Sequence, residues 1–192
     1  MTNIRIPSGL IDENIEMFLS PCSNLLAIHG GIVKGFFELP QILLQAVDAE
    51  MSRFPSTIQA LKAAGFNSHK EQLTKYAKCR FGGFDMNADF ENGKLSEAEY
   101  HECGYRGECP MEGIVCGFFK FHGNIITPFD VSMIKLLATE DTLPVIAEKL
   151  TVCMNTFEVK KKLLFEKLGV LSRARLVAVC YDLQILNLQL CS

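Results

Sequence analysis

Residues 126–180 read ITPFDVSMIKLLATEDTLPVIAEKLTVCMNTFEVKKKLLFEKLGVLSRARLVAVC, and helical signals follow one another along this whole stretch. Thr127, Pro128 and Asp130 supply a capping hydroxyl, a proline at the first helical position and an acid three residues after the cap. This combination satisfies the exposed amides at a helix start. Apolar residues at helical spacing follow, and Gly169 is suited to the left-handed conformation that often ends a helix. The stretch therefore predicts a helical module.

Four helices are expected in this module. The first follows the Thr127 cap, and a second, short helix opens at Pro144. Residues 151–154 are few enough to form a turn, and a third helix is expected from about Asn155 to Leu168. Ser172 then caps the fourth helix. The order of elements is one helix, then a helix-turn-helix, then one more helix.

Several short motifs in this order resemble the LuxR-type DNA-binding domain of bacterial transcription regulators. They are Ile126-Thr127-Pro128, Leu136-Leu137-Ala138, Ile146-Ala147-Glu148-Lys149-Leu150, Asn155-Thr156, Lys167-Leu168-Gly169-Val170 and Ser172-Arg173-Ala174. The resemblance covers somewhat over a quarter of the chain. It implies a four-helix fold and binding to double-stranded DNA. It also implies a possible homodimer through the fourth helix, Ser172 to Tyr181.

The third helix of such a domain enters the major groove, where its early residues meet bases and phosphates. The resemblance therefore implies DNA-binding roles for Asn155, Thr156, Glu158, Lys161 and Lys162. Helical spacing places the last three on one face. It turns Phe157, Leu164 and Leu168 toward the core instead.

Departures from the family pattern support a second interpretation. The family usually has a basic residue where this chain has Glu158, and a carboxylate facing phosphates is costly, although glutamate can accept a hydrogen bond from cytosine. Residues 123–192 hold eight lysines and arginines against seven aspartates and glutamates, a net charge of +1. The alternative is a protein-interaction or assembly module that keeps the fold but no longer reads DNA.

The cysteine-rich segment 78–122 carries the pattern Cys79-x23-Cys103-x5-Cys109-x6-Cys116 among glycines and aromatics. Four thiolates suffice for a closed zinc site or for an iron–sulfur cluster, and a bound metal can fold a segment that lacks its own core. Zinc is the first expectation, an iron–sulfur cluster the alternative, and unligated core cysteines the third reading. His101 and His122 are further candidate ligands.

Eight cysteines would also suit a disulfide scaffold, but the first residues show no secretory signal. We therefore expect a cytoplasmic protein with reduced thiols. The LuxR-type resemblance implies a bacterial source. Cys22, Cys153, Cys180 and Cys191 stand among apolar neighbours and are expected to be buried small residues. No apolar run approaches the roughly 20 residues of a membrane helix, so no membrane partner is expected.

The N-terminal region, 1–77, is expected to be helical with short strands. Helical periodicity runs from Leu39 to Tyr76, whereas residues 28–37 resemble short strand-like pieces. The fold class expected is mainly α, with an N-terminal helical region, a loop-dominated metal-binding segment at 78–122 and the LuxR-like module at 123–192.

No catalytic constellation is evident, so an enzyme is not expected. The Phe81–Phe84 stretch lacks the glycine spacing and the lysine of a phosphate-binding loop. Asp85 and Asp89 are close in sequence but have no matching histidine, serine or second acid set. They are expected to be turn residues or exposed charges.

Overall fold

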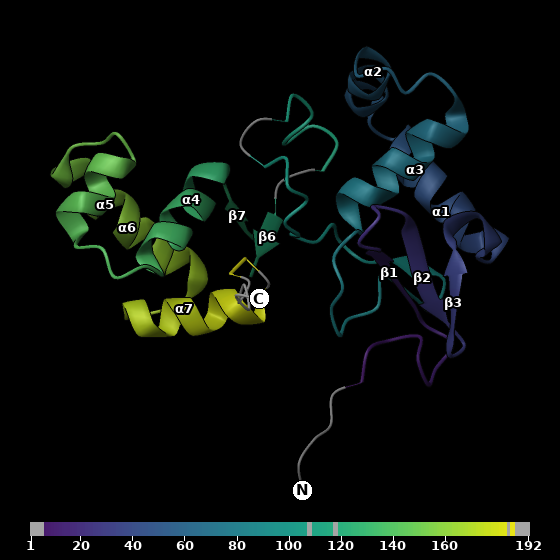
Figure 1. Cartoon of the computed structure of the whole chain (residues 1–192), viewed down its shortest axis with the longest axis horizontal. Coiled ribbons are helices and arrows are strands. Elements are labelled where there is room, and N and C mark those ends of the chain that lie inside the picture. The colour runs from purple at the N-terminus through teal and green to yellow at the C-terminus, as the bar shows by residue number, and fades with distance from the viewer. Residues whose placement is uncertain (1–5, 107–108, 117–118, 184, 187–192) are drawn as a thin grey trace, which may run out of the picture. The chain divides into compact units, whose positions relative to one another are not determined.

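The computed structural model describes residues 6–106, 109–116, 119–183 and 185–186. The chain divides into two compact units (Figure 1). The first comprises the described residues of Met1–Glu99 and Cys103–Gly117, and the second those of Tyr100–Glu102 and Phe118–Ser192. Across these ranges, no helix combines the length and the apolar character needed to cross a membrane.

A five-stranded antiparallel sheet with the order β3-β2-β1-β4-β5 forms the base of the first unit. Its strands are β1 (Ile15–Leu19), β2 (Leu25–His29), β3 (Ile32–Gly35), β4 (Phe90–Glu91) and β5 (Lys94–Leu95). β1 and β2 pair along their whole length, from Ile15 opposite His29 to Leu19 opposite Leu25. β4 joins the sheet from far along the chain, with Phe90 opposite Ile15.

A two-residue Gly30-Gly31 turn connects β2 to β3. Both glycines have positive φ, 59° and 74°. Two-residue hairpin loops favour this conformation because its twist matches that of the flanking strands, and glycine adopts it without steric cost. A Cβ at Gly31 would also lie 3.1 Å from the carbonyl oxygen of Leu10. The glycine pair therefore fixes the register of the hairpin.

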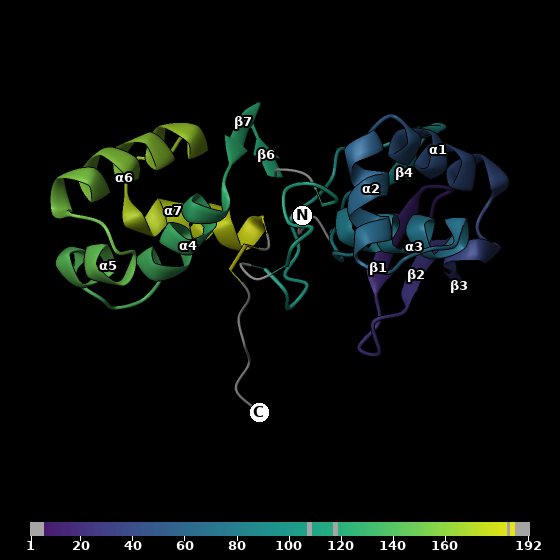
Figure 2. The same ribbon diagram turned by 90° about the horizontal axis from the view of Figure 1, so that it is seen from above.

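Helices follow the hairpin along the chain (Figures 1 and 2) and supply about half of the buried core residues of the first unit. They are η1 (Phe36–Glu38), α1 (Gln41–Ser52), α2 (Pro55–Ala63) and α3 (His69–Arg80). Ser68 caps α3 in a reciprocal capping box with Glu71. Because strand side chains alternate between faces, Ile15 and Met17 point to the same side, where they are buried in one cluster with Leu43 and Val47 of α1.

The expectation of a mainly α chain is wrong. The described residues form a mixed α/β protein, because the hairpin β1–β2–β3 and the returning strands β4 and β5 build a complete sheet. Among the described residues, no group of three or more histidine, cysteine or acidic side chains is arranged to hold a metal ion, so the metal-binding segment expected as part of the fold is not seen. Pairing between Ile15 and Phe90 spans a sequence distance that local periodicity does not reveal.

The second unit is helical apart from the two-stranded β6 (Phe119–Phe121) and β7 (Asn124–Ile126). Its helices are α4 (Pro128–Leu137), α5 (Leu143–Lys149), α6 (Met154–Leu168) and α7 (Arg173–Asp182), at the positions expected from the sequence. The capping box of Thr127 and Asp130 is present, and Gly169 ends α6 with φ of 63°. All four helices contribute side chains to one core, including Ile134, Ile146, Leu164 and Leu176.

Candidate functional site

The connection between α5 and α6 is a tight turn. Thr151 has a φ of 57°, a left-handed conformation that costs a β-branched residue free energy. Its amide donates to the carbonyl of Glu148 at 2.9 Å, and the amide of Val152 donates to that of Ala147 at 3.1 Å. Cys153 then occupies the N-cap of α6 in an extended conformation. The chain therefore passes from α5 into α6 within a few residues.

One face of α6 belongs to the core and the other to solvent. Phe157, Leu164 and Leu168 are buried, as the helical spacing predicted. Asn155 and Thr156 in the first turn are exposed. The helix is thus held firmly along its length while its N-terminal end remains accessible.

Charges on α6 are partly paired within the helix. Lys161 lies 2.6 Å from the Glu158 carboxylate, and its side chain is only 20% exposed. Lys162 approaches Glu166 at 4.0 Å, but its side chain is 80% exposed. Lys160 is exposed, with its ammonium 4.5 Å from the centre of the Phe129 ring. Lys160 and Lys162 are therefore the cations more accessible to a ligand, because Lys161 is held in an ion pair with Glu158.

The N-cap of α6 is chemically distinct from the other helix starts. The Cys153 sulfur lies 3.2 Å from the Thr156 hydroxyl. Hydrogen bonding from Thr156 lowers the pKa of the Cys153 thiol, whereas burial raises the pKa of the Cys180 thiol to about 12. The expectation that the scattered cysteines are buried is wrong for Cys22 and Cys153, which are exposed, and confirmed for Cys180. Cys191 lies outside the described residues.

The predicted pairing helix, α7, directs much of its apolar surface into its own unit. Leu176 and Cys180 are fully buried, and Val177 and Val179 pack partly against the same core. Tyr181 is 38% exposed. Homodimerisation through this helix stays a prediction, with less apolar surface available to it than the sequence pattern indicated.

The four clustered cysteines all belong to the first unit, and each is partly buried. Burial raises the pKa of the Cys79 thiol to about 11, a nearby Lys75 lowers it, and the charges of Cys116, Cys103 and Cys109 raise it further. All three thiols therefore lie within electrostatic reach of Cys79. The four cysteines are not arranged as a set of metal ligands, because no group of three or more side chains able to hold a metal ion occurs among the described residues.

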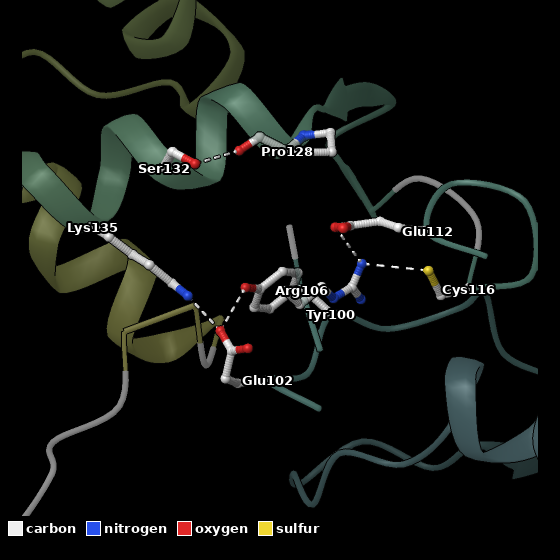
Figure 3. A network of polar contacts seen from close by, with 8 residues as sticks. All are labelled: Tyr100, Glu102, Arg106, Glu112, Cys116, Pro128, Ser132 and Lys135. Atoms are coloured by element: carbon white, nitrogen blue, oxygen red, sulfur yellow. Dashed lines mark hydrogen bonds and ion pairs between the residues drawn. The ribbon is translucent and has the colours of Figure 1, made fainter. Parts of the chain in front are cut away.

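An arginine supports this segment. Arg106 donates to the carboxylate of Glu112 and to the sulfur of Cys116, each at 3.5 Å (Figure 3). Cys79 and Cys109 also pack against the core cluster that includes Met111 and Val115. Apolar packing and the contacts of Arg106 thus stabilise the cysteine-rich segment. The candidate ligands His101 and His122 belong to the second unit.

A buried carboxyl cluster was missed at the sequence level. Glu16 and Asp89 are 0% and 2% exposed, so the expectation that Asp89 is a turn residue or exposed charge is wrong. The Glu16 carboxylate accepts from the Asp85 amide at 2.8 Å, that of Asp89 from the Met17 amide at 2.7 Å, and that of Glu99 from the Gly83 amide at 2.5 Å. Each of these hydrogen bonds therefore joins a side-chain carboxyl to a backbone amide in a distant segment of the chain.

Burial is the largest cause of the pKa shifts in this cluster. Desolvation raises the pKa of Glu16 to about 9 and that of Glu99 to about 8, and it raises the pKa of Asp89 well above its usual range. Repulsion between neighbouring carboxylates adds to each shift. For Glu16 and Glu99, the protonated carboxyl is the favoured state at neutral pH. The alternation of Ile15, Met17 and Leu19 places Glu16 on the opposite face of the strand, so the local pattern did not indicate its burial.

Comparison of the chain with protein-family models, with curated proteins and with solved structures gives no match.

Proposed function

We propose that the protein is a bacterial, cytoplasmic transcription regulator that binds double-stranded DNA through α6. The observation that carries the proposal is the exposed N-terminal half of α6 after a tight turn from α5, with its opposite face anchored by Phe157 and Leu164. In a helix-turn-helix the second helix needs this combination: rigid support from the core and a free face toward the groove. The resemblance to LuxR-type domains points to the same helix.

The exposed side chains divide into two chemical groups. Asn155 and Thr156 carry hydrogen-bonding groups at the start of the helix, suited to base edges or phosphates. Lys160 and Lys162 supply exposed positive charge suited to phosphates. Lys161 was expected to share this role, but its ion pair with Glu158 reduces the charge that it presents.

Selection of tight-binding duplexes from a random pool, followed by fluorescence anisotropy with the selected duplex, tests the proposal. Lys162→Ala should weaken binding several-fold at about 0.1 M salt, because one phosphate contact is lost. Lys94→Ala removes an equal charge from an exposed strand position in the first unit and should leave binding unchanged. Equal binding by wild type and Lys162→Ala would remove α6 as the DNA-contacting helix.

Glu158→Gln probes the carboxylate that departs from the family pattern. The substitution removes a negative charge from the proposed DNA-facing helix and releases Lys161 from its partner at 2.6 Å. Duplex affinity should rise by about threefold to tenfold, since one repulsion is lost and one cation is gained. Weaker binding would instead assign Glu158 to direct base contact.

A protein-assembly role is the second candidate, and one observation favours it. Val159 and Leu163 lie one turn apart on α6 and are 61% and 49% exposed. Exposed apolar pairs of this kind suit a protein partner better than a phosphate backbone. Sedimentation velocity at 0.5 M salt discriminates the two roles: an assembly module should self-associate through this face and lose the association in a Val159→Gln, Leu163→Gln variant. A monomer that binds DNA argues against it.

Zinc bound by Cys79, Cys103, Cys109 and Cys116, or alternatively an iron–sulfur cluster, stays a prediction. The electrostatic reach of the other three thiols to Cys79 supports it. Their arrangement would have to tighten, because a tetrahedral zinc site needs sulfurs at about 2.3 Å from the ion. Metal analysis of protein purified without oxygen tests it: about one zinc per chain, or several irons with visible colour, would support a metal. Metal-free, fully folded protein would contradict it.

A further inference from the structure

A cavity of about 520 Å³ opens beside α3 in the first unit. It lies where Leu19 at the end of β1, the side of α3 and Tyr105 of the cysteine-rich segment come together. Its volume falls within the range of about 300 to 1,000 Å³ that is usual for small-molecule sites. Such sites combine apolar walls with a few polar groups that orient the ligand.

Two aromatic rings and a lysine are among the residues that line this cavity. Lys75 places its ammonium 5.8 Å from the centre of the Phe66 ring and 5.9 Å from that of the Tyr105 ring. The cation therefore stands within reach of both rings. Tyr105 is 68% exposed although it is a large aromatic residue. An apolar ligand body that covers these rings would bury them from water.

Positive charge dominates the cavity lining. Lys70, Lys75 and Lys78 all line it, and the hydrogen bond of Lys78 to the carbonyl oxygen of Ser23 leaves its charge uncompensated. Among the residues that the structure describes, none of the three lysines pairs with a carboxylate.

The acidic residue at the cavity edge is already engaged. Glu71 accepts hydrogen bonds from the amide and the hydroxyl of Ser68, at 2.9 and 2.8 Å. These bonds fix its carboxylate at the N-terminus of α3, where it completes the cap. The Oε2 oxygen of Glu71 is therefore committed to the helix cap and does not neutralise the lysines of the cavity.

We propose that this cavity binds a small organic anion. Its flat apolar body lies against Phe66 and Tyr105, and its carboxylate, sulfonate or phosphate pairs with Lys75 and Lys78. The assignment goes beyond the proposed function and does not rest on it, because every residue used belongs to the first unit whereas α6 belongs to the second. Loss of DNA binding would leave it intact.

Titration with anilinonaphthalene sulfonate, a fluorescent anion with a flat apolar body, tests the proposal on the full chain. The chain holds no tryptophan, so the dye can be excited and read without an indole background. We expect saturable binding of one dye per chain. Naphthaleneacetate should displace the dye, and naphthylmethylamine, which has the same rings and the opposite charge, should not.

Lys75→Met keeps the aliphatic stem and removes the charge, and it should weaken dye binding by about tenfold or more. Lys75→Arg restores the charge and should recover most of the affinity. Lys62→Met, at an exposed position on α2 away from the cavity, is the matched control and should bind as wild type does. Thermal melting by circular dichroism checks that each variant is folded.

Two results would overturn the proposal. One is equal dye affinity in folded Lys75→Met and wild type, and the other is equal displacement by the ammonium and carboxylate competitors. Displacement by a short duplex that depends on Lys75 would also overturn it, because the cavity edge would then be a nucleic-acid contact.

Discussion

Replacing Glu16 by glutamine should make the stability of the first unit less dependent on pH. Glu16 is completely buried, and one of its carboxyl oxygens accepts a hydrogen bond from the Asp85 amide at 2.8 Å. Its second oxygen is among the buried atoms without a hydrogen-bond partner. Glutamine has the shape of the protonated acid and keeps the acceptor, but it cannot ionise.

The direction of the effect follows from the raised pKa. Glu16 has a folded-state pKa of about 9 against an ordinary value of 4.5. In the unfolded chain it ionises above pH 4.5, whereas in the folded protein it keeps its proton until about pH 9. Its contribution to stability is therefore full below pH 4.5 and is lost as the pH rises toward 9.

The pKa shift of Glu16 also sets an upper limit on the change in the free energy of unfolding. Each pKa unit corresponds to about 1.4 kcal/mol, which gives about 6 kcal/mol for Glu16 acting alone. Glu99 and Asp89 titrate alongside it, and local rearrangement lets water reach a charged carboxylate. We therefore expect Glu16→Gln to stabilise the first unit by about 2 to 4 kcal/mol at pH 8.5 and by less than about 1 kcal/mol at pH 5.

Urea unfolding followed by circular dichroism at pH 5, 7 and 8.5 measures this. Glu91→Gln, at an exposed position on β4, is the control and should follow the wild-type pH profile. Parallel pH profiles for Glu16→Gln and wild type would refute the reasoning, as would a loss of stability on substitution at pH 8.5.

Two substitutions at the α5–α6 turn should stabilise the second unit. Thr151→Gly relieves a β-branched residue at a φ of 57° and should raise the free energy of unfolding by about 0.5 to 1 kcal/mol, whereas Thr151→Val should not. Cys153→Ser supplies a stronger N-cap acceptor for the Thr156 amide and should add about 0.5 to 1 kcal/mol. Thermal denaturation of each variant checks both, and a lowered melting temperature for either would contradict the turn and cap geometry.

Local signals predicted much of the second unit. Thr127 with Asp130, Ser172 and Gly169 each act within a few residues, and the structure places all of them at helix ends as expected. Capping depends on backbone amides that are adjacent in sequence, so one chain segment contains the whole interaction. The exposed face of α6 follows from the same short-range periodicity.

The first unit could not be predicted in this way because its interactions join distant segments. Phe90 pairs with Ile15, and the Asp89 carboxylate accepts from the Met17 amide across 72 positions. A single strand of five residues has too short a pattern to show which partner it will find. Gly30-Gly31 between apolar runs was the available hairpin signal.

The salt dependence of duplex binding tests the central claim most directly. On a selected duplex, wild-type affinity should fall steeply as salt rises, and a Lys160→Ala, Lys162→Ala variant should show a log–log slope that is shallower by about 1.8, since each phosphate contact contributes about 0.9. An unchanged slope in this variant, with folded protein, would contradict DNA contact through α6. Binding that is insensitive to salt would favour the assembly role instead.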